Sequence, residues 1–164
     1  MKELPNVCHI GWLSRDIRKT LSFFRSMPNY RCDELVHLAT MKPGDLHLGT
    51  RYDFYYCVVA VGSYEFEIIQ PVEETSSGSY PFQWMEQHGE GFHNIAFSYD
   101  SEAEYLLMSE ILKQQGMEQV FFGDFTVEEG TDDESVVSVQ FFSDPVSERV
   151  IEISCAIRGA WKKG

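Results

Sequence analysis

Apolar and polar residues follow the same order twice along this chain. A strand-like run comes first, then a stretch with apolar residues at helical spacing, and then further strand-like runs. In the first half we expect a strand over 7–13, a helix over 15–26, and strands over 54–61 and 64–69. In the second half we expect a strand over 93–99, a helix over 101–115, and strands over 136–142 and 150–154. The pattern predicts an α+β protein made of two similar modules.

Turn-forming residues place the module boundaries. Pro71 follows the last strand of the first half, and a Ser/Gly/Pro-rich stretch with one short helical run separates it from the second half. We therefore expect a single domain over 1–164, with modules at about 1–72 and 90–157 joined by a linker over 73–89. A strand, a helix and about three strands are too few to close a core alone, so the two modules should pair.

Ligand-type residues recur at matching places in the two modules. His9 lies on the first strand of one module and His93 on the first strand of the other, while Glu67 and Glu152 lie on the last strands. The histidines are offset by 84 positions and the glutamates by 85. Pairing of the modules would bring the four side chains together, so we predict that His9, Glu67, His93 and Glu152 bind one divalent metal ion.

Each of these residues has a simpler interpretation when it is taken alone. A lone histidine on an apolar strand is more often a hydrogen-bonded core residue than a ligand. A glutamate between apolar neighbours is different, because alternation turns its carboxylate to the opposite face, toward water, a charge or a metal. Glu65 shares a strand face with Glu67 and stays a competitor for its place. Imidazole and carboxylate ligands suit zinc, nickel, cobalt, manganese or iron(II) without choosing among them.

The charge balance limits the partners of the protein. With 26 acidic and 13 basic residues, the formal net charge is −13, which repels nucleic acids and anionic membranes. The first six residues carry charge and a proline where a signal peptide would be apolar, so we expect a cytoplasmic protein. The expected partner is a small-molecule carbonyl substrate, with neither nucleic acid nor membrane; whether a homodimer closes the site stays open.

Several motifs of the chain resemble the vicinal-oxygen-chelate superfamily, which includes glyoxalases, methylmalonyl-CoA epimerases, extradiol dioxygenases and drug-resistance proteins. The resemblance covers nearly the whole chain and rests on 9–11, 15–17, 66–71, 88–97, 144–145 and 150–153. The segment 88–97 is most similar to methylmalonyl-CoA epimerase and its glyoxalase-like relatives, although Asn94 stands where those epimerases commonly have a second histidine. The resemblance implies two paired βαβββ modules that form a curved mixed sheet around a metal site.

The resemblance also implies a reaction. Four protein ligands leave two positions on an octahedral metal for neighbouring oxygens of a substrate, which favours proton abstraction beside a carbonyl by a lyase or isomerase. Resemblance to glyoxalases indicates Glu152 as the general base, with Glu67 and Glu65 as alternatives. The other functions considered are an extradiol-type dioxygenase and a non-catalytic binding or resistance protein of the same fold. The spans 40–52 and 121–134 are expected to be additions that wall the site.

Overall fold

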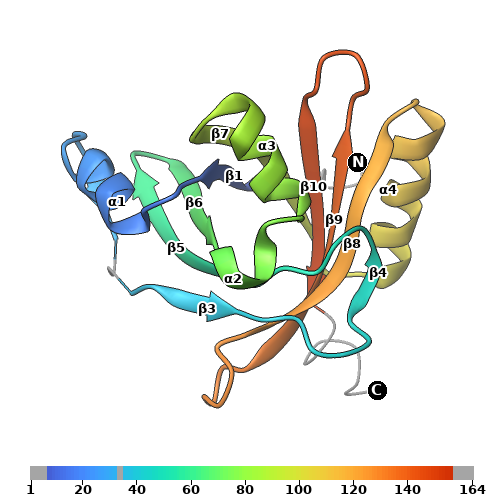
Figure 1. The fold of residues 1–164 in the computed structure, drawn as a ribbon, viewed down its shortest axis with the longest axis horizontal. Helices are drawn as coiled ribbons and strands as arrows, with labels where there is room; N and C mark the ends of the chain where they lie inside the picture. The colour runs from blue at the N-terminus through green and yellow to red at the C-terminus, as the bar shows by residue number, and fades with distance from the viewer. Residues whose placement is uncertain (1–6, 33–34, 157–164) are drawn as a thin grey trace.

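The computed structural model describes residues 7–32 and 35–156, and in these ranges ten strands form one curved mixed sheet (Figure 1). The first half contains β1 (Val7–Leu13), α1 (Ile17–Arg25), β2 (Tyr30–Arg31), β3 (His37–Ala39), β4 (Leu46–Leu48), β5 (Phe54–Val61) and β6 (Tyr64–Pro71). The second half contains β7 (Gly91–Tyr99), α4 (Glu102–Gln114), β8 (Glu118–Val127), β9 (Ser135–Ser143) and β10 (Val150–Ala156). Two short helices, α2 (Glu73–Ser76) and α3 (Tyr80–His88), lie between the halves.

The two halves have the same strand arrangement. In the first half β1 pairs in parallel with β6, which pairs antiparallel with β5; in the second half β7 pairs in parallel with β10, which pairs antiparallel with β9. The halves join where β1 and β7 run antiparallel at the centre of the sheet. This arrangement confirms the predicted α+β fold class, whereas the exact module limits stay a prediction.

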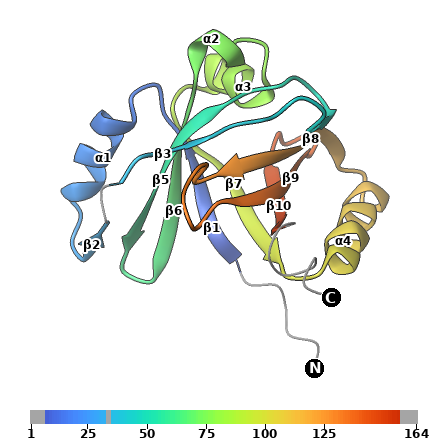
Figure 2. The same cartoon turned by 90° about the horizontal axis from the view of Figure 1, so that it is seen from below.

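Each half is covered on its outer side by one helix, α1 or α4, as the two flanks of Figure 2 show. Asp16 caps α1 by accepting hydrogen bonds from two backbone amides in its first turn. The predicted apolar positions Ile17, Leu21 and Phe24 are all buried, and they pack against the outer face of β5 and β6. In the second half, Tyr105 and Leu112 of α4 pack in the same way against β9 and β10. The helices therefore leave the inner, concave faces of the halves free for the site.

Residues 37–52, which we call the covering segment, cross from the first half to the second. The segment begins as β3, paired with β5, and continues through Thr40, whose backbone exchanges two hydrogen bonds with Thr126 of β8. It then forms β4, which pairs with the outer side of β8. The segment thus spans the gap between the outer strands of the two halves, and β3 can be followed across that gap in Figure 2.

The main core lies between the two halves and beneath the covering segment. It includes buried residues from both halves together with Ala39, Met41 and Tyr52 of the segment. Close packing of the segment depends on Gly123 of β8, where an added Cβ would lie 2.5 Å from Cε of Met41. Within the expected wall over 40–52, Met41 and Tyr52 are therefore buried in the core while most of the residues between them are exposed, and the expected addition over 121–134 begins as part of β8.

Candidate metal centre

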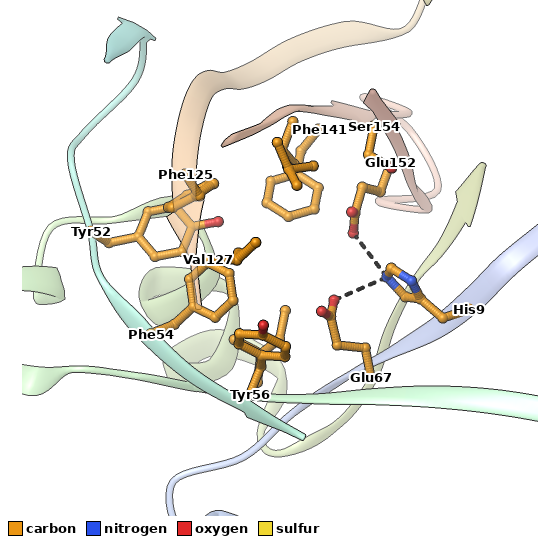
Figure 3. A pocket seen from close by; sticks show the side chains of 13 residues that line it. His9, Tyr52, Phe54, Tyr56, Glu67, Phe125, Val127, Phe141, Glu152 and Ser154 are labelled. Atoms are coloured by element: carbon orange, nitrogen blue, oxygen red, sulfur yellow. Dashed lines mark ion pairs between the residues drawn. The ribbon is translucent and has the colours of Figure 1, made fainter. Parts of the chain in front are cut away.

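Three of the four predicted ligands converge at one end of the concave inner surface (Figure 3). Nε2 of His9 lies 3.0 Å from Oε2 of Glu67 and 3.5 Å from Oε2 of Glu152. The side chain of Glu152 is 6% exposed, that of His9 14% and that of Glu67 17%. One imidazole and two carboxylates therefore share a site with little access to water.

The strand register explains why these residues meet. Ala96 of β7 is paired with His9 on one side and with Glu152 on the other, so both ligands lie level on strands that flank β7. Glu67 is paired with Gly11, two positions along β1 from His9 on the same face. The inward curvature of the sheet then turns the three side chains toward one another (Figure 3).

The geometry and chemistry of this group fit a divalent ion. Ligand atoms about 2.1 Å from one ion lie roughly 3.0–3.4 Å from each other in octahedral or tetrahedral arrangements, which is close to the observed separations. Nε2 of His9 is buried, and no atom of the described residues forms an aligned hydrogen bond with it, although two carboxylates are near. An imidazole nitrogen beside two carboxylate oxygens is a donor set for a first-row transition metal.

Electrostatics couple His9 to the two carboxylates. Burial alone would lower the pKa of His9, but the charges of Glu67 and Glu152 outweigh it and raise the pKa well above 6.5. Without a metal, an imidazolium between the two carboxylates thus balances part of their charge. The same carboxylates add to the effect of burial on Tyr52, whose pKa is raised well above 10, so its phenol stays neutral.

His93, the fourth predicted ligand, does not join this group. Its ring is buried against Trp84 and the rings of Tyr80 and Phe141, and Nδ1 lies 2.8 Å from Oδ1 of Asn94. Burial lowers the pKa of His93 to about 4, so the ring is neutral at physiological pH. The structure therefore presents His93 as a neutral core histidine beside the centre.

Asn94 occupies the position that the sequence interpretation gave to His93. Its Nδ2 donates a 2.9 Å hydrogen bond to Oε2 of Glu152. Gly11 pairs with Asn94, and Trp12 pairs with Phe92, so His93 is an extra residue in a β-bulge. The bulge buries two consecutive residues of β7, which simple strand alternation does not predict.

The sequence contains a signal for this register. His9 and Asn94 are offset by 85 positions, the same as Glu67 and Glu152, whereas His9 and His93 are offset by 84. An exact repeat thus aligns His9 with Asn94. The difference of one residue between the two offsets is the sequence signal for a register in which Asn94, rather than His93, aligns with His9.

The other polar candidates lie apart from the centre. Glu65 is exposed, which leaves Glu67 as the glutamate of β6 in the group. Gln70, on the other face of β6, accepts a 2.8 Å hydrogen bond from the backbone of Ile17 at the start of α1. His47 and His88 contact Asp124 and Glu148 on the surface.

A cavity of about 220 Å³ opens beside the three ligands. Besides the ligands and Ser154, its lining consists of aromatic and aliphatic side chains from both halves: Tyr52, Phe54, Tyr56, Ile69, Phe125, Val127, Val137, Val139 and Phe141 (Figure 3). A concave, mainly apolar space with a few polar groups at one end is typical of small-molecule sites. The centre can therefore present a metal-bound group to a ligand whose remaining atoms contact rings and methyl groups.

Comparison with solved structures identifies the fold. A hypothetical protein from Bacillus halodurans matches 96% of this chain and 99% of its own, with 19% identity and a TM-score of 0.58. Methylmalonyl-CoA epimerase from Mycobacterium tuberculosis matches 94% of this chain and 92% of its own, with 14% identity and a TM-score of 0.56. The Streptomyces coelicolor enzyme, in complex with 2-nitronate-propionyl-CoA, matches 94% and 99%, with 17% identity and a TM-score of 0.54.

These proteins share the glyoxalase-like fold of the vicinal-oxygen-chelate proteins, and the chain described here has that fold. The resemblance in fold inferred from the sequence motifs is therefore confirmed. No model of a known protein family matches the sequence, and no curated protein matches it either. No helix within the described ranges is long and apolar enough to cross a membrane.

Proposed function

We propose that this protein is a divalent-metal-dependent enzyme of the glyoxalase or epimerase type, which removes a proton next to a chelated carbonyl group. The observation that carries the proposal is the convergence of His9, Glu67 and Glu152 at the end of an apolar cavity. The epimerases among the structures of the same fold support the same class of reaction.

His9, Glu67 and Glu152 would hold the ion. When bound, a divalent ion supplies Lewis-acid polarisation of a carbonyl oxygen and stabilises negative charge that develops there. The chain itself supplies the shape: the aromatic walls exclude water, and the short contacts of His9 with both carboxylates keep the donor atoms close together. Asn94 keeps Oε2 of Glu152 pointing into the centre through its hydrogen bond.

We propose Glu152 as the general base, as the resemblance to glyoxalases implies. Its carboxylate lines the cavity, and the hydrogen bond from Asn94 engages only Oε2, so the other oxygen would be available to accept a proton. A base must come within about 3 Å of the proton it removes, and the place of Glu152 in the lining of the cavity supports this role. Glu67 also lines the cavity and is the alternative general base. Separate substitutions of Glu67 and Glu152 are needed to tell the two apart.

Two other functions predict different outcomes. Three protein ligands leave room for both catechol and oxygen, as an extradiol-type dioxygenase requires, but facial iron sites of oxygenases use two histidines and one carboxylate rather than one histidine and two. A non-catalytic binding or resistance protein would hold a ligand without exchanging its protons. Oxygen consumption with iron(II) tests the first, and absence of turnover with full metal content tests the second.

Metal content is the first test of the proposal. Purified protein loaded with zinc, nickel, cobalt, manganese or iron(II) should retain about one ion per chain by elemental analysis. His9→Ala should lose the ion, because it removes the only imidazole of the described metal group. Glu65→Gln is the matched control, since Glu65 is exposed and outside that group. Full metal content in His9→Ala would refute the proposed centre.

Proton exchange is the second test. In heavy water, the loaded protein should incorporate deuterium next to the carbonyl of at least one 2-hydroxy ketone, 2-oxo thiohemiacetal or α-substituted thioester. Glu152→Gln should slow exchange by about 10²-fold or more, since a general base contributes at least that much. Oxygen uptake with catechols and no exchange of any carbonyl substrate would replace the proposal with the dioxygenase alternative.

A further inference from the structure

We propose that the cavity selects small uncharged carbonyl compounds with an apolar substituent, and that it excludes coenzyme A thioesters and carboxylate-bearing substrates. This inference rests on the proposed function and names the substrate class of the same centre. It separates this chain from the fold neighbours whose names include methylmalonyl-CoA.

The covering segment is the first observation. It binds to β5 at one end and to β8 at the other, across the gap between the outer strands of the two halves. Within the segment, the backbone of Met41 donates a 2.9 Å hydrogen bond to Oδ1 of Asp53, and Tyr52 is buried among the rings of Phe54, Phe121 and Phe125. A long substrate cannot extend from the centre through this side without breaking a packed part of the core.

Volume is the second observation. The cavity measures about 220 Å³, below the range of roughly 300–1,000 Å³ that is typical of ligand pockets. A space of this volume takes the reacting end of a small molecule, and any larger substituent would have to extend out through the mouth of the cavity.

Charge is the third observation. None of the 13 residues described as lining the cavity is lysine or arginine, while two are glutamates. Burial, together with nearby Glu128 and Glu67, raises the pKa of Tyr56 to about 12, so this wall residue is a neutral phenol, and a tyrosine supplies no cation in any protonation state. A carboxylate or phosphate placed among these walls would lose its hydration without gaining a cationic partner. A neutral carbonyl compound avoids that cost.

A matched pair of metal chelators tests the charge selection. Benzohydroxamate and 4-carboxybenzohydroxamate present the same chelating group and differ by one carboxylate. Calorimetric titration of the metal-loaded protein should give a dissociation constant at least tenfold lower for benzohydroxamate. Methylmalonyl-CoA, titrated in the same way, should show no measurable binding.

Two arginine variants test whether the wall of the cavity causes the preference for benzohydroxamate over its carboxylate derivative. Val137 is half-buried in the wall, and Val137→Arg should reduce the preference for benzohydroxamate to less than threefold by supplying a cation. Val146→Arg adds the same charge at a turn residue that is 91% exposed and outside the lining, so it should leave the preference unchanged. If Val137→Arg does not fold, the comparison of the two hydroxamates on the unmodified protein still tests the charge selection.

The outcomes separate this inference from the proposed function. If metal and benzohydroxamate bind, but the carboxylate derivative or methylmalonyl-CoA binds equally well, the substrate class is wrong and the metal centre stands. If elemental analysis finds no bound metal, the proposed function fails and this inference fails with it.

Discussion

The amide of Asn94 donates a 2.9 Å hydrogen bond to Glu152, and its oxygen lies 2.8 Å from Nδ1 of buried His93. With the Nδ1 proton on His93, these contacts form a chain from the core to a carboxylate of the proposed centre. Neighbours of this kind fix the orientation of metal ligands and tune their basicity. His93 is thus placed to act on the centre through Asn94.

Gly11 leaves space for the side chain of Asn94, which links His93 to Glu152. A Cβ at residue 11 would lie 2.0 Å from Oδ1 of Asn94, so Gly11→Ala must displace the amide. We expect metal affinity to fall by about 10–100-fold and stability to fall by roughly 1–3 kcal/mol as a buried amide loses its partners. Isothermal calorimetry and urea unfolding measure the two effects.

Two further variants identify the cause of this loss. Gly78→Ala is the control, because its nearest neighbour would be Cγ2 of Thr50 at an ordinary 3.6 Å. The double variant Gly11→Ala with Asn94→Ala removes the steric overlap, so it should regain stability relative to Gly11→Ala without regaining metal affinity. Unchanged metal affinity in Gly11→Ala would show that Asn94 does not position Glu152.

Replacing His93 tests whether this residue is a metal ligand or a buried core residue. His93→Gln keeps a hydrogen-bond donor for Asn94, and because His93 is outside the metal group, the variant should retain about one ion per chain. Elemental analysis after gel filtration measures the content. Loss of the ion in His93→Gln, to the same degree as in His9→Ala, would support the four-ligand prediction that includes His93.

The same variant tests the acid stability of the fold. The pKa of His93 is lowered to about 4 from 6.5, so the unfolded chain gains a proton at a higher pH than the folded chain does. The stability that neutral His93 contributes is therefore present above pH 6.5 and is lost as pH falls toward 4. The loss should be on the order of 3 kcal/mol, at 1.36 kcal/mol per pKa unit.

Urea unfolding from pH 7.5 to 4.5, in the presence of a chelator, measures this loss. The unfolding free energy of His93→Gln should fall less steeply with decreasing pH than that of the unmodified protein. Parallel curves for the two proteins would contradict a buried neutral imidazole.

The sequence was sufficient to predict the repeated elements and to single out three residues whose side chains the fold brings together. Glu67 and Glu152 are recognisable because apolar neighbours force their carboxylates onto the other strand face, and His9 because it precedes the first helix at the matching distance. His93 lies outside the described group because a β-bulge shifts the register by one residue, and period-two alternation carries no information about a bulge.

Long-range pairing explains what else the sequence did not predict. The covering segment forms only short strands, whose partners β5 and β8 lie in different halves of the chain. Its buried residues Met41 and Tyr52 have no periodic pattern that distinguishes a core segment from a loop. Tyr52 of this segment also lines the cavity, so the volume of the cavity could not be predicted from the sequence.

Two adjacent phenylalanines of α1 test the packing of the first half. Phe24 is 1% exposed and packs on β5 and β6, whereas Phe23 is 50% exposed. Phe24→Ala should cost about 3–5 kcal/mol of unfolding free energy, because it removes a buried ring and leaves a cavity. Phe23→Ala is the matched control and should cost about 1 kcal/mol or less, through its contact with Trp12. Equal losses in urea unfolding would show that α1 does not pack as described.

Metal binding should release a proton from His9. Glu67 and Glu152 outweigh the effect of burial and raise the pKa of His9 well above 6.5, so the imidazole is protonated at pH 7 without a metal. A ligand nitrogen must be unprotonated, and each ion bound at pH 6–7 should therefore release about one proton. Affinity should fall about tenfold for each pH unit below the raised pKa, and the release should decline as the pH rises through it. Calorimetric titrations with zinc, in buffers of different ionisation enthalpy, measure the number of protons released.

His93→Gln is the control and should release the same number of protons, because His93 is already neutral. Binding without proton release at pH 6–7 would mean that His9 is unprotonated between the two carboxylates, contrary to the electrostatics of the centre.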